Sequence, residues 1–438
     1  MLLVMSLVFY AYGEPTLTVL LLISTYANYW FGRLIGGAQG TSRRTWMVVA
    51  AVANLSMLGV FKYAGMLVQT LNGLLGTHVP DPGIPLPLGI SFYTFQALSY
   101  VIDVYRNDVE PQRRYSRVLL YISFFPQLIA GPIVKYHDIE RQMESRTETW
   151  EDAALGLRRF CLGLSKKVLV ADAMAVAADA LFGLDPARLS APAAWLGAFA
   201  YLMQIYFDFS AYSDMAIGLG RMFGFTFKEN FDHPYASVNV QEFWRRWHMS
   251  LSTWLREYLY FPLGGNRRGK VRTVLNRMTV FLLCGLWHGA NWTFVVWGLL
   301  HGLALLAEEV VPLRKLPRAL GHAYTLLFVT LTFVVFRCDT LGQATAFLGS
   351  MAFGWHFDAA GIIPFAEQLT PLFVSTAVVG VLLAGSVPDR LSKVVARHAQ
   401  GRGQLLQGCS YLVAFALLAI CFMSLASGTY SPFIYFRF

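Results

Sequence analysis

Phe243-Trp-Arg-Arg-Trp-His-Met-Ser-Leu-Ser-Thr-Trp-Leu-Arg-Glu-Tyr-Leu-Tyr-Phe-Pro-Leu-Gly-Gly-Asn266 is the stretch around which the fold of this chain can be worked out. It is dense in Arg, Trp and Tyr, whereas most of the remaining chain is apolar. A second stretch, Gly285-Leu-Trp-His-Gly-Ala-Asn-Trp292, sets a histidine inside an apolar run. Tryptophan gathers where a chain meets a membrane surface, and an ionisable residue within the bilayer is costly. The pattern predicts one histidine at a membrane interface and one at membrane depth.

The composition is that of a polytopic membrane protein. Of the 438 residues, 56% are hydrophobic and 14% are charged, whereas a soluble domain has about 25% charged residues. We therefore predict an all-α transmembrane bundle that forms one integral domain over residues 1–438. The net charge is +9, but Lys and Arg stand in short clusters between apolar runs. That pattern is typical of cytoplasmic loops facing membrane lipids, and it excludes a nucleic-acid partner, which needs a contiguous basic surface.

Apolar runs of membrane-spanning length recur along the chain. Crossing about 30 Å of hydrocarbon takes roughly 20 helical residues. On this criterion we predict spans at Leu17–Ile35, Trp46–Tyr63, from Pro85 onward, Val168–Phe182, Ala193–Leu219, Ala323–Phe336, Pro371–Val387 and Tyr411–Leu425. We expect loops at Ala64–Pro82 and between Phe336 and Leu369. The basic stretch from Arg221 to Arg277 should form interfacial amphipathic helices on the cytoplasmic face.

Two further apolar segments are predicted to be re-entrant. Val118–Val134 has basic flanks and contains two prolines and a glycine, and broken backbone is tolerated at membrane depth where protein or water satisfies it. The basic cluster Arg314–Arg318 and the later spans fix the number of membrane crossings. For that cluster to lie in the cytoplasm, Met278–Glu308 must begin and end on the cytoplasmic side. Because it is too short for two full spans, we expect it to dip in and return, with His288 and Asn291 near its turn.

His288 is the strongest candidate for a catalytic residue. A neutral imidazole at membrane depth can accept a proton from a hydroxyl group. The structural alternative is a neutral imidazole bonded to a backbone carbonyl. Asn291 lies three residues later and either orients a substrate or an oxyanion, or only caps the turn.

His248 follows Trp244, Arg245 and Arg246 in the first stretch. Helical spacing would place Trp244 and His248 on one face. A membrane-interface belt explains the Trp and Arg residues, but it does not explain the histidine. The functional interpretation is a cationic, aromatic-walled mouth that binds an anionic acyl donor.

Asp208 and Asp214 stand six residues apart in the predicted span Ala193–Leu219. We consider Asp208 for substrate binding, with proton relay and structural ion pairing as the alternatives. The sequence has no HExxH, GxSxG or CxxC motif, and we expect no metal site. His301 and His322 lie at the ends of predicted spans and receive no role.

These stretches together resemble the signature blocks of the membrane-bound O-acyltransferases. The resemblance covers nearly the whole chain, except that a full-length first helix is missing. It is strongest to the branch that contains the bacterial alginate O-acetyltransferase inner-membrane subunit. Besides the two histidine stretches, the matching blocks are Pro87-Leu-Gly-Ile-Ser-Phe-Tyr-Thr-Phe-Gln96, Phe125-Pro-Gln-Leu-Ile-Ala-Gly-Pro132, Tyr206-Phe-Asp-Phe-Ser210 and Pro432-Phe-Ile-Tyr-Phe436.

The resemblance implies a helical bundle with a central pore, in which a cytoplasmic thioester meets an acceptor reached from outside. His288 and His248 would be the catalytic histidines. The donor would be acetyl-CoA or another acyl thioester, with no bound cofactor. A periplasmic acetyltransferase partner of an exopolysaccharide system would pass the acetyl group on, and the chain would reside in the bacterial inner membrane.

Two other functions compete with polysaccharide O-acetylation. One is D-alanyl transfer toward teichoic acids in the same fold. The other is a proton-coupled transporter in which the intramembrane histidines and aspartates carry protons. Transporters often contain inverted repeats, and this sequence has no matched halves.

Overall fold

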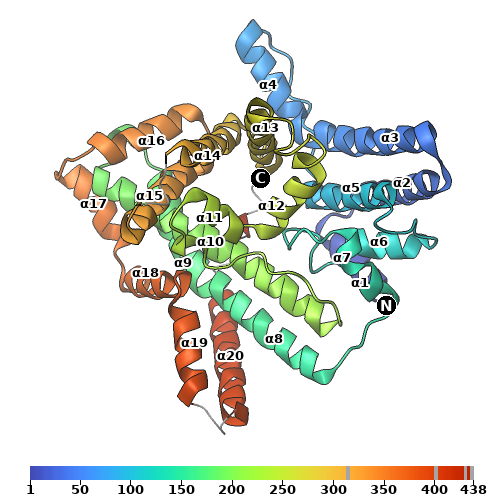
Figure 1. Ribbon diagram of the computed structural model, residues 1–438. Helices are drawn as coiled ribbons and strands as arrows, with labels where there is room; N and C mark the ends of the chain where they lie inside the picture. The colour runs from blue at the N-terminus through green and yellow to red at the C-terminus, as the bar shows by residue number, and fades with distance from the viewer. Residues whose placement is uncertain (312–315, 399–402, 429–431, 435–438) are drawn as a thin grey trace. The chain divides into compact units, whose positions relative to one another are not determined.

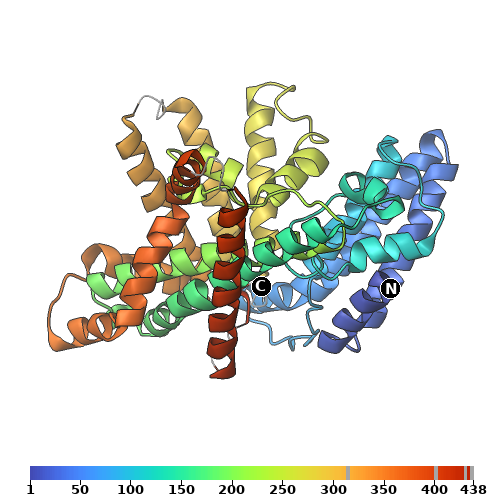
Figure 2. The ribbon, with the colours of Figure 1, turned by 90° about the horizontal axis from the view of Figure 1, so that it is seen from below.

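The computed structural model describes residues 1–311, 316–398, 403–428 and 432–434. Throughout this part of the chain the regular elements are helices, and none is a strand (Figures 1 and 2). Among the described residues, four helical stretches are long and apolar enough to cross a membrane: Gly40–Leu75, Trp292–Val310, Arg318–Arg337 and Gly403–Ala426. The bent pair Ala359–Gln368 and Pro371–Ala384 would be a fifth if it forms one span. The all-α, multi-pass prediction is confirmed. Arg314 and Lys315, from the predicted basic cluster, and residues 435–438 lie outside the described residues.

The chain divides into two compact units. The first comprises Met1–Gly156, Leu219–Lys228 and Arg256–Leu259, and the second comprises Leu157–Gly218, Glu229–Leu255 and Tyr260–Phe438. That residues 1–438 form one integral domain stays a prediction. In the first unit the helices are α1 (Leu2–Gly13), α2 (Thr18–Gly37), α3 (Gly40–Leu58), α4 (Ala64–Leu75), α5 (Ile90–Arg106), α6 (Tyr115–Ser123) and α7 (Tyr136–Glu144).

The expected loop at Ala64–Pro82 is wrong in its first half. A π-helical turn, Gly59–Tyr63, joins α3 to α4, so the helix continues to Leu75. Leu67, Leu71 and Leu74 recur there at helical spacing, and no proline interrupts them. The loop begins only at Gly76. The predicted span ended at Tyr63, because a span needs only about 20 helical residues, whereas this helical stretch continues well beyond that length.

The segment after α6 has the broken backbone that the sequence predicts. Phe124–Lys135 is non-helical and almost entirely buried. Side chains satisfy part of its backbone and that of α6: Tyr121 donates to the Val134 carbonyl at 2.8 Å, and Gln127 donates to the Tyr121 carbonyl at 2.7 Å. A buried non-helical backbone needs such partners. The re-entrant path of Val118–Val134 through the membrane stays a prediction.

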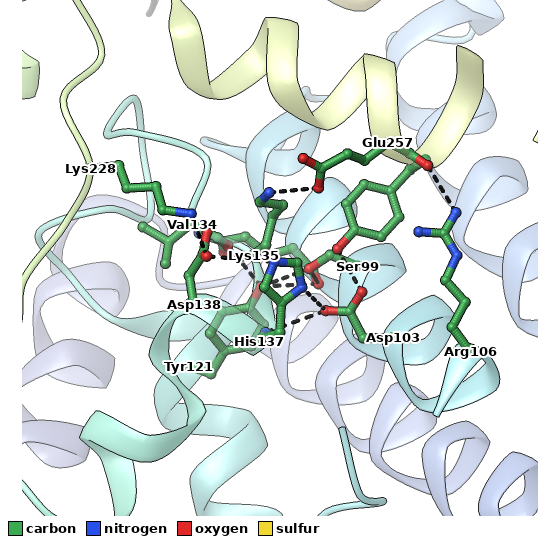
Figure 3. A network of polar contacts seen from close by, with 12 residues as sticks. Ser99, Asp103, Arg106, Tyr121, Val134, Lys135, His137, Asp138, Lys228 and Glu257 are labelled. Atoms are coloured by element: carbon green, nitrogen blue, oxygen red, sulfur yellow. Dashed lines mark hydrogen bonds and ion pairs between the residues drawn. The ribbon is translucent and has the colours of Figure 1, made fainter. Parts of the chain in front are cut away.

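A charged network follows α5 in the first unit (Figure 3). The carboxylate of Asp103 is fully buried and accepts hydrogen bonds from the Tyr258 hydroxyl at 2.6 Å and from Nδ1 of His137 at 2.9 Å. Lys135 forms an ion pair with Glu257 at 2.7 Å. The Arg-Trp-Tyr stretch therefore contributes Glu257 and Tyr258 as anchors for the end of α5 and the start of α7.

The remaining helices lie wholly or mainly in the second unit. They are α8 (Trp150–Ser165), α9 (Asp172–Phe182), α10 (Ala191–Met222), α11 (Val240–Arg246), α12 (Met249–Leu255), α13 (Lys270–His288), α14 (Trp292–Val310), α15 (Arg318–Arg337), α16 (Leu341–Phe353), α17 (Ala359–Gln368), α18 (Pro371–Ala384), α19 (Val387–His398) and α20 (Gly403–Ala426). The expected loop up to Leu369 is wrong. Thr340 and Asp358 cap α16 and α17 by accepting hydrogen bonds from the Gln343 and Gly361 amides.

α13 and α14 form a hairpin whose turn lies at Gly289–Asn291 (Figure 1). It begins at Lys270, eight residues before the predicted start at Met278. Each arm has 19 residues and is about 28 Å long, but of the two only α14 is also apolar enough to cross a membrane. The re-entrant path stays a prediction. The backbones touch near the turn, because a Cβ at Gly285 would clash with the Phe294 carbonyl and one at Gly298 with the Phe281 carbonyl.

Candidate active site

His288 is the last residue of α13 and is 4% exposed. Its Nδ1 lies 2.7 Å from the carbonyl oxygen of Cys284, one helical turn earlier. A carbonyl can only accept a hydrogen bond, so Nδ1 carries the proton of the neutral ring. Nε2 is then the basic nitrogen. The carbonyl bond of the structural alternative is therefore present, and it sets the tautomer that a general base needs.

His248 lies between two short helices and is completely buried. α11 ends at Arg246, α12 begins at Met249, and His248 has a φ of 44°. The expectation that Trp244 and His248 share one helical face is wrong, because the helix breaks between them. Left-handed backbone is rare for a residue other than glycine and clusters at functional sites. This conformation could not be read from the sequence.

The Asn230 side chain orients His248. Nδ1 of His248 is 3.3 Å from Oδ1 of Asn230, and the same oxygen accepts a hydrogen bond from the Ser250 hydroxyl at 2.8 Å. The Asn230 amide nitrogen donates to Ser213 at 3.0 Å, which fixes the orientation of the amide. Since Oδ1 is an acceptor, Nδ1 of His248 donates to it. The tautomer of His248 therefore matches that of His288.

The structure brings the two predicted catalytic histidines together. Their ring centroids are 6.4 Å apart with the planes at 80°. Aromatic rings surround the pair: Phe209 lies 4.6 Å from His248, and Trp297 lies 4.9 Å from His288. Burial lowers the pKa of His248 well below its usual range, and the neighbouring His288 adds to this effect. We therefore expect His248 to be neutral near pH 7 in a buried, aromatic site.

His301 is a third buried histidine that sequence reasoning passed over. Nε1 of Trp244 donates to Nδ1 of His301 at 3.1 Å, and Nε2 of His301 is 3.2 Å from the Thr332 hydroxyl. Indole is only a donor, so this ring is also neutral, with its proton on Nε2. The polar edges of Trp244 and His301 are thus used within the fold. Its position in the sequence could have drawn attention to it. His301 is the second histidine of the apolar segment that contains His288, and burying a histidine in such a segment without a hydrogen-bond partner is energetically costly.

Trp297 separates His288 from His301, with its ring 4.9 Å from the first and 4.8 Å from the second. Its side chain is 1% exposed. The indole N–H has no hydrogen-bond partner among the described residues, and neither has the buried hydroxyl of Thr293. The indole N–H of Trp297 is therefore available beside the predicted base, and sequence analysis singled out neither residue.

The predicted substrate-binding residues lie in different surroundings. Asn291 caps α14: its Oδ1 accepts from the Thr293 amide at 3.0 Å, and its Nδ2 donates to the Asp339 carbonyl at 2.6 Å. The capping alternative is what the structure shows. Asp208 is buried, and its carboxylate binds Lys167 at 2.7 Å and the amide of Ile434 at 2.9 Å. A role of either residue in substrate binding stays a prediction.

Arg245 and Arg246 do not line a common entrance with His248. Arg245 is exposed, and Arg246 pairs with Glu242 at 3.0 Å and with Asp232 at 3.5 Å, whereas His248 is fully buried. Their binding of a donor stays a prediction. A cavity of about 530 Å³ does reach the histidine surroundings, because Asn230 and Phe231 line it. Ser210 and Ser213 also line this cavity, and so do the charged residues Arg159, Lys166, Asp214 and Glu229.

Comparison with known proteins identifies a family and several relatives of this chain. A model of the membrane-bound O-acyltransferase family matches residues 112–336, which include all three buried histidines. A protein named probable alginate O-acetylase AlgI from Pseudomonas putida is 40% identical over 100% of this chain and 94% of its own length. The peptidoglycan O-acetyltransferase of Helicobacter pylori is 39% identical over 79% of this chain and 72% of its own length. The teichoic acid D-alanyltransferase of Bacillus subtilis is 29% identical over 52% of this chain and 60% of its own length.

A match to half of the chain and 40% identity over its full length decide against the transporter alternative. The paired histidines lie within the matched region. The chain therefore belongs to the membrane-bound O-acyltransferase family and is an O-acyltransferase.

Proposed function

We propose that this protein transfers an acetyl group from a thioester to a hydroxyl group for the O-acetylation of an exported, alginate-like polysaccharide. The observation that carries the proposal is the bond from Nδ1 of His288 to the Cys284 carbonyl, which leaves Nε2 as the basic nitrogen in a buried site. The identity to a probable alginate O-acetylase over the full chain supports the acceptor class.

His288 acts as the general base in this proposal. Its Nε2 takes the proton of the acceptor hydroxyl while the hydroxyl oxygen bonds to the carbonyl carbon of the thioester. The carbon–sulfur bond then breaks, and the proton passes from His288 to the leaving thiolate. A positioned base contributes about 10²–10⁴-fold to the rate of such a step. His248 lies 6.4 Å away and is expected to be neutral, so it adds no second positive charge beside the protonated His288.

The donor is acetyl-CoA or another acyl thioester on the cytoplasmic side, and the acceptor is reached from outside. The acetyl group thus crosses the bacterial inner membrane within this protein and passes to a periplasmic acetyltransferase partner of the exopolysaccharide system. The basic Arg245 and Arg246 bind the phosphates of the donor in this scheme. Arginine is suited to this task, because its planar donors match phosphate oxygens.

D-alanyl transfer toward teichoic acids is the alternative within the same family. Its support is weaker, because the teichoic acid D-alanyltransferase is 29% identical over half of this chain. The peptidoglycan O-acetyltransferase, at 39% identity, favours an acetyl group and a glycan acceptor.

The test is replacement of His288 by Ala and by Gln. Both variants should accumulate in the membrane, because neither change removes a large apolar anchor. Gln keeps a hydrogen-bonding group but cannot take the proton, so we expect the acetyl-ester content of the exported polymer to fall to background in both. Substantial acetylation by either variant at a normal protein level would overturn the role of His288.

A further inference from the structure

A second cavity of the second unit has no role so far. It encloses about 910 Å³ and is not lined by His248, His288 or Asn230. Most of its wall consists of apolar side chains from α10, α15 and α18, such as Phe199, Leu326 and Val381. Arg318, Arg390 and His322 also line it, and none of the lining residues whose side chains the structure describes is an aspartate or a glutamate. Among these side chains the cavity is therefore apolar along its walls and positively charged at one end.

The two arginines come from distant parts of the sequence. Arg318 is the first residue of α15, and Arg390 lies in the first turn of α19. Both are exposed, and within the described ranges neither forms an ion pair. The starts of both helices line the cavity as well, and helix N-termini favour anions. Two arginines and two helix N-termini around one cavity point to a phosphate.

The cavity is also elongated along α15. It extends from Arg318 to Thr330, twelve positions later in the helix, which corresponds to about 18 Å. Leu326, Leu327 and Thr330 line it away from the charged end. α15 is long and apolar enough to cross a membrane, and its basic start is predicted to face the cytoplasm. An occupant with an anionic head and an apolar chain fits both ends.

We propose that this cavity binds one anionic phospholipid, with its phosphate between Arg318 and Arg390 and an acyl chain along α15. Anionic lipids are enriched in the cytoplasmic leaflet, where the arginines are expected to lie. The bound lipid would also contact Tyr235, which packs against the segment that carries His248. Tyr235 lines the cavity, donates to the Leu202 carbonyl at 2.6 Å and stacks on Trp247, the residue before His248.

The experiment uses the purified, delipidated full-length protein in detergent. Phosphatidylglycerol is added, and its binding is measured by native mass spectrometry and by the shift in the thermal unfolding midpoint. Phosphatidylcholine with the same acyl chains tests the headgroup charge, and glycerol 3-phosphate tests the headgroup without chains. The variants are Arg318→Gln with Arg390→Gln, and Ala384→Phe, which fills the apolar part. Lys393→Gln is the matched control, because Lys393 is exposed on α19 and does not line the cavity.

We expect one phosphatidylglycerol per chain, bound at least about tenfold more weakly by the double arginine variant, since a charge-assisted bond is worth that factor or more. Ala384→Phe should weaken binding with both charges intact, and Lys393→Gln should not. Equal binding by the double variant, or an equal loss in Lys393→Gln, overturns the proposal. Binding of glycerol 3-phosphate as tight as that of phosphatidylglycerol also overturns the proposal, because the cavity would then be a site for a free phosphate compound. Displacement of the lipid by acetyl-CoA would assign the cavity to the donor, and it overturns the lipid as well.

Discussion

The chemistry of the site depends on which nitrogen of each buried histidine carries a proton. His288 and His248 donate through Nδ1 to a carbonyl and to an amide oxygen, whereas His301 accepts through Nδ1 from an indole. The first two rings therefore present a basic Nε2, and the third presents none. This difference distinguishes the two predicted catalytic histidines from His301, whose nitrogens contact Trp244 and Thr332.

Trp297 is predicted to donate its indole N–H to the oxyanion that forms on the thioester carbonyl. The N–H is buried beside His288 and has no other partner among the described residues. Removing one such donor from an acyl-transfer site lowers kcat about 10²–10³-fold. We expect Trp297→Phe, which keeps the ring but not the N–H, to lose acetyl transfer by a factor in this range at an unchanged protein level.

The matched control is Trp195→Phe. The N–H of Trp195 donates to the Met351 carbonyl at 3.0 Å, so this change removes an indole that is already bonded within the fold. It should lower stability slightly and leave the acetyl-transfer rate per folded molecule intact. If Trp297→Phe behaves in the same way, the indole of Trp297 serves packing alone.

The sequence identified both catalytic candidates but not their surroundings. His288 and His248 stood out because a histidine in an apolar or aromatic stretch lacks an obvious structural reason. The left-handed turn at His248, its bond to Asn230 and the pairing of Trp244 with His301 depend on contacts between segments that are distant in the chain. No local pattern encodes such contacts.

At the scale of elements, some of the apolar spans were predictable and the helices between them were not. The predicted spans Ala323–Phe336 and Tyr411–Leu425 lie within α15 and α20, which are long and apolar enough to cross a membrane. Ala193–Leu219 lies within α10, which is long enough but does not meet this criterion. α4 and α16 were predicted as loops, because they are too short to register as spans by themselves. The π-helical turns at Gly59–Tyr63 and Arg256–Tyr260 have no sequence signature.

The network around Asp103 is predicted to make the first unit more stable at acidic than at alkaline pH. The hydrogen bond to Asp103 raises the pKa of His137 above its ordinary value, and burial opposes this in part. The folded state thus favours the charged form. That stabilisation is fully present below the unfolded pKa of about 6.5 and is lost as the pH rises through the folded pKa.

The measurement is the thermal unfolding midpoint of the purified protein as a function of pH. We expect the midpoint to fall as the pH rises above about 6.5, and His137→Gln to remove this decline. His78→Gln, in the exposed loop after α4, is the control and should leave the decline unchanged. A decline of the same size in His137→Gln would mean that other groups cause it.

For the whole molecule, the distribution of basic residues predicts which ends face the cytoplasm. Single cysteines at Arg141 in α7 and at Val310, the last residue of α14, should be shielded from an impermeant thiol reagent added outside. Val310 lies shortly before the basic cluster Arg314–Arg318, which is predicted to face the cytoplasm. A cysteine at the exposed Val79 should be labelled, because the loop around it lacks Lys and Arg.

The background for this test should carry Cys409→Ser, since Cys409 is exposed while Cys161, Cys284, Cys338 and Cys421 are buried. Labelling at Arg141 would place that end of the broken segment outside. Labelling at Val310 would mean that the hairpin does not return to its side of entry.

The hairpin of α13 and α14 is joined at two levels along its length. Arg277 pairs with Glu309 near the ends away from the turn, and Gly285 meets Gly298 close to it. These two contacts hold the arms of the hairpin in one register. Because Arg277 and His288 belong to the same helix, about 16 Å apart along its axis, we expect a shift of α13 at Arg277 to change the position of His288 as well.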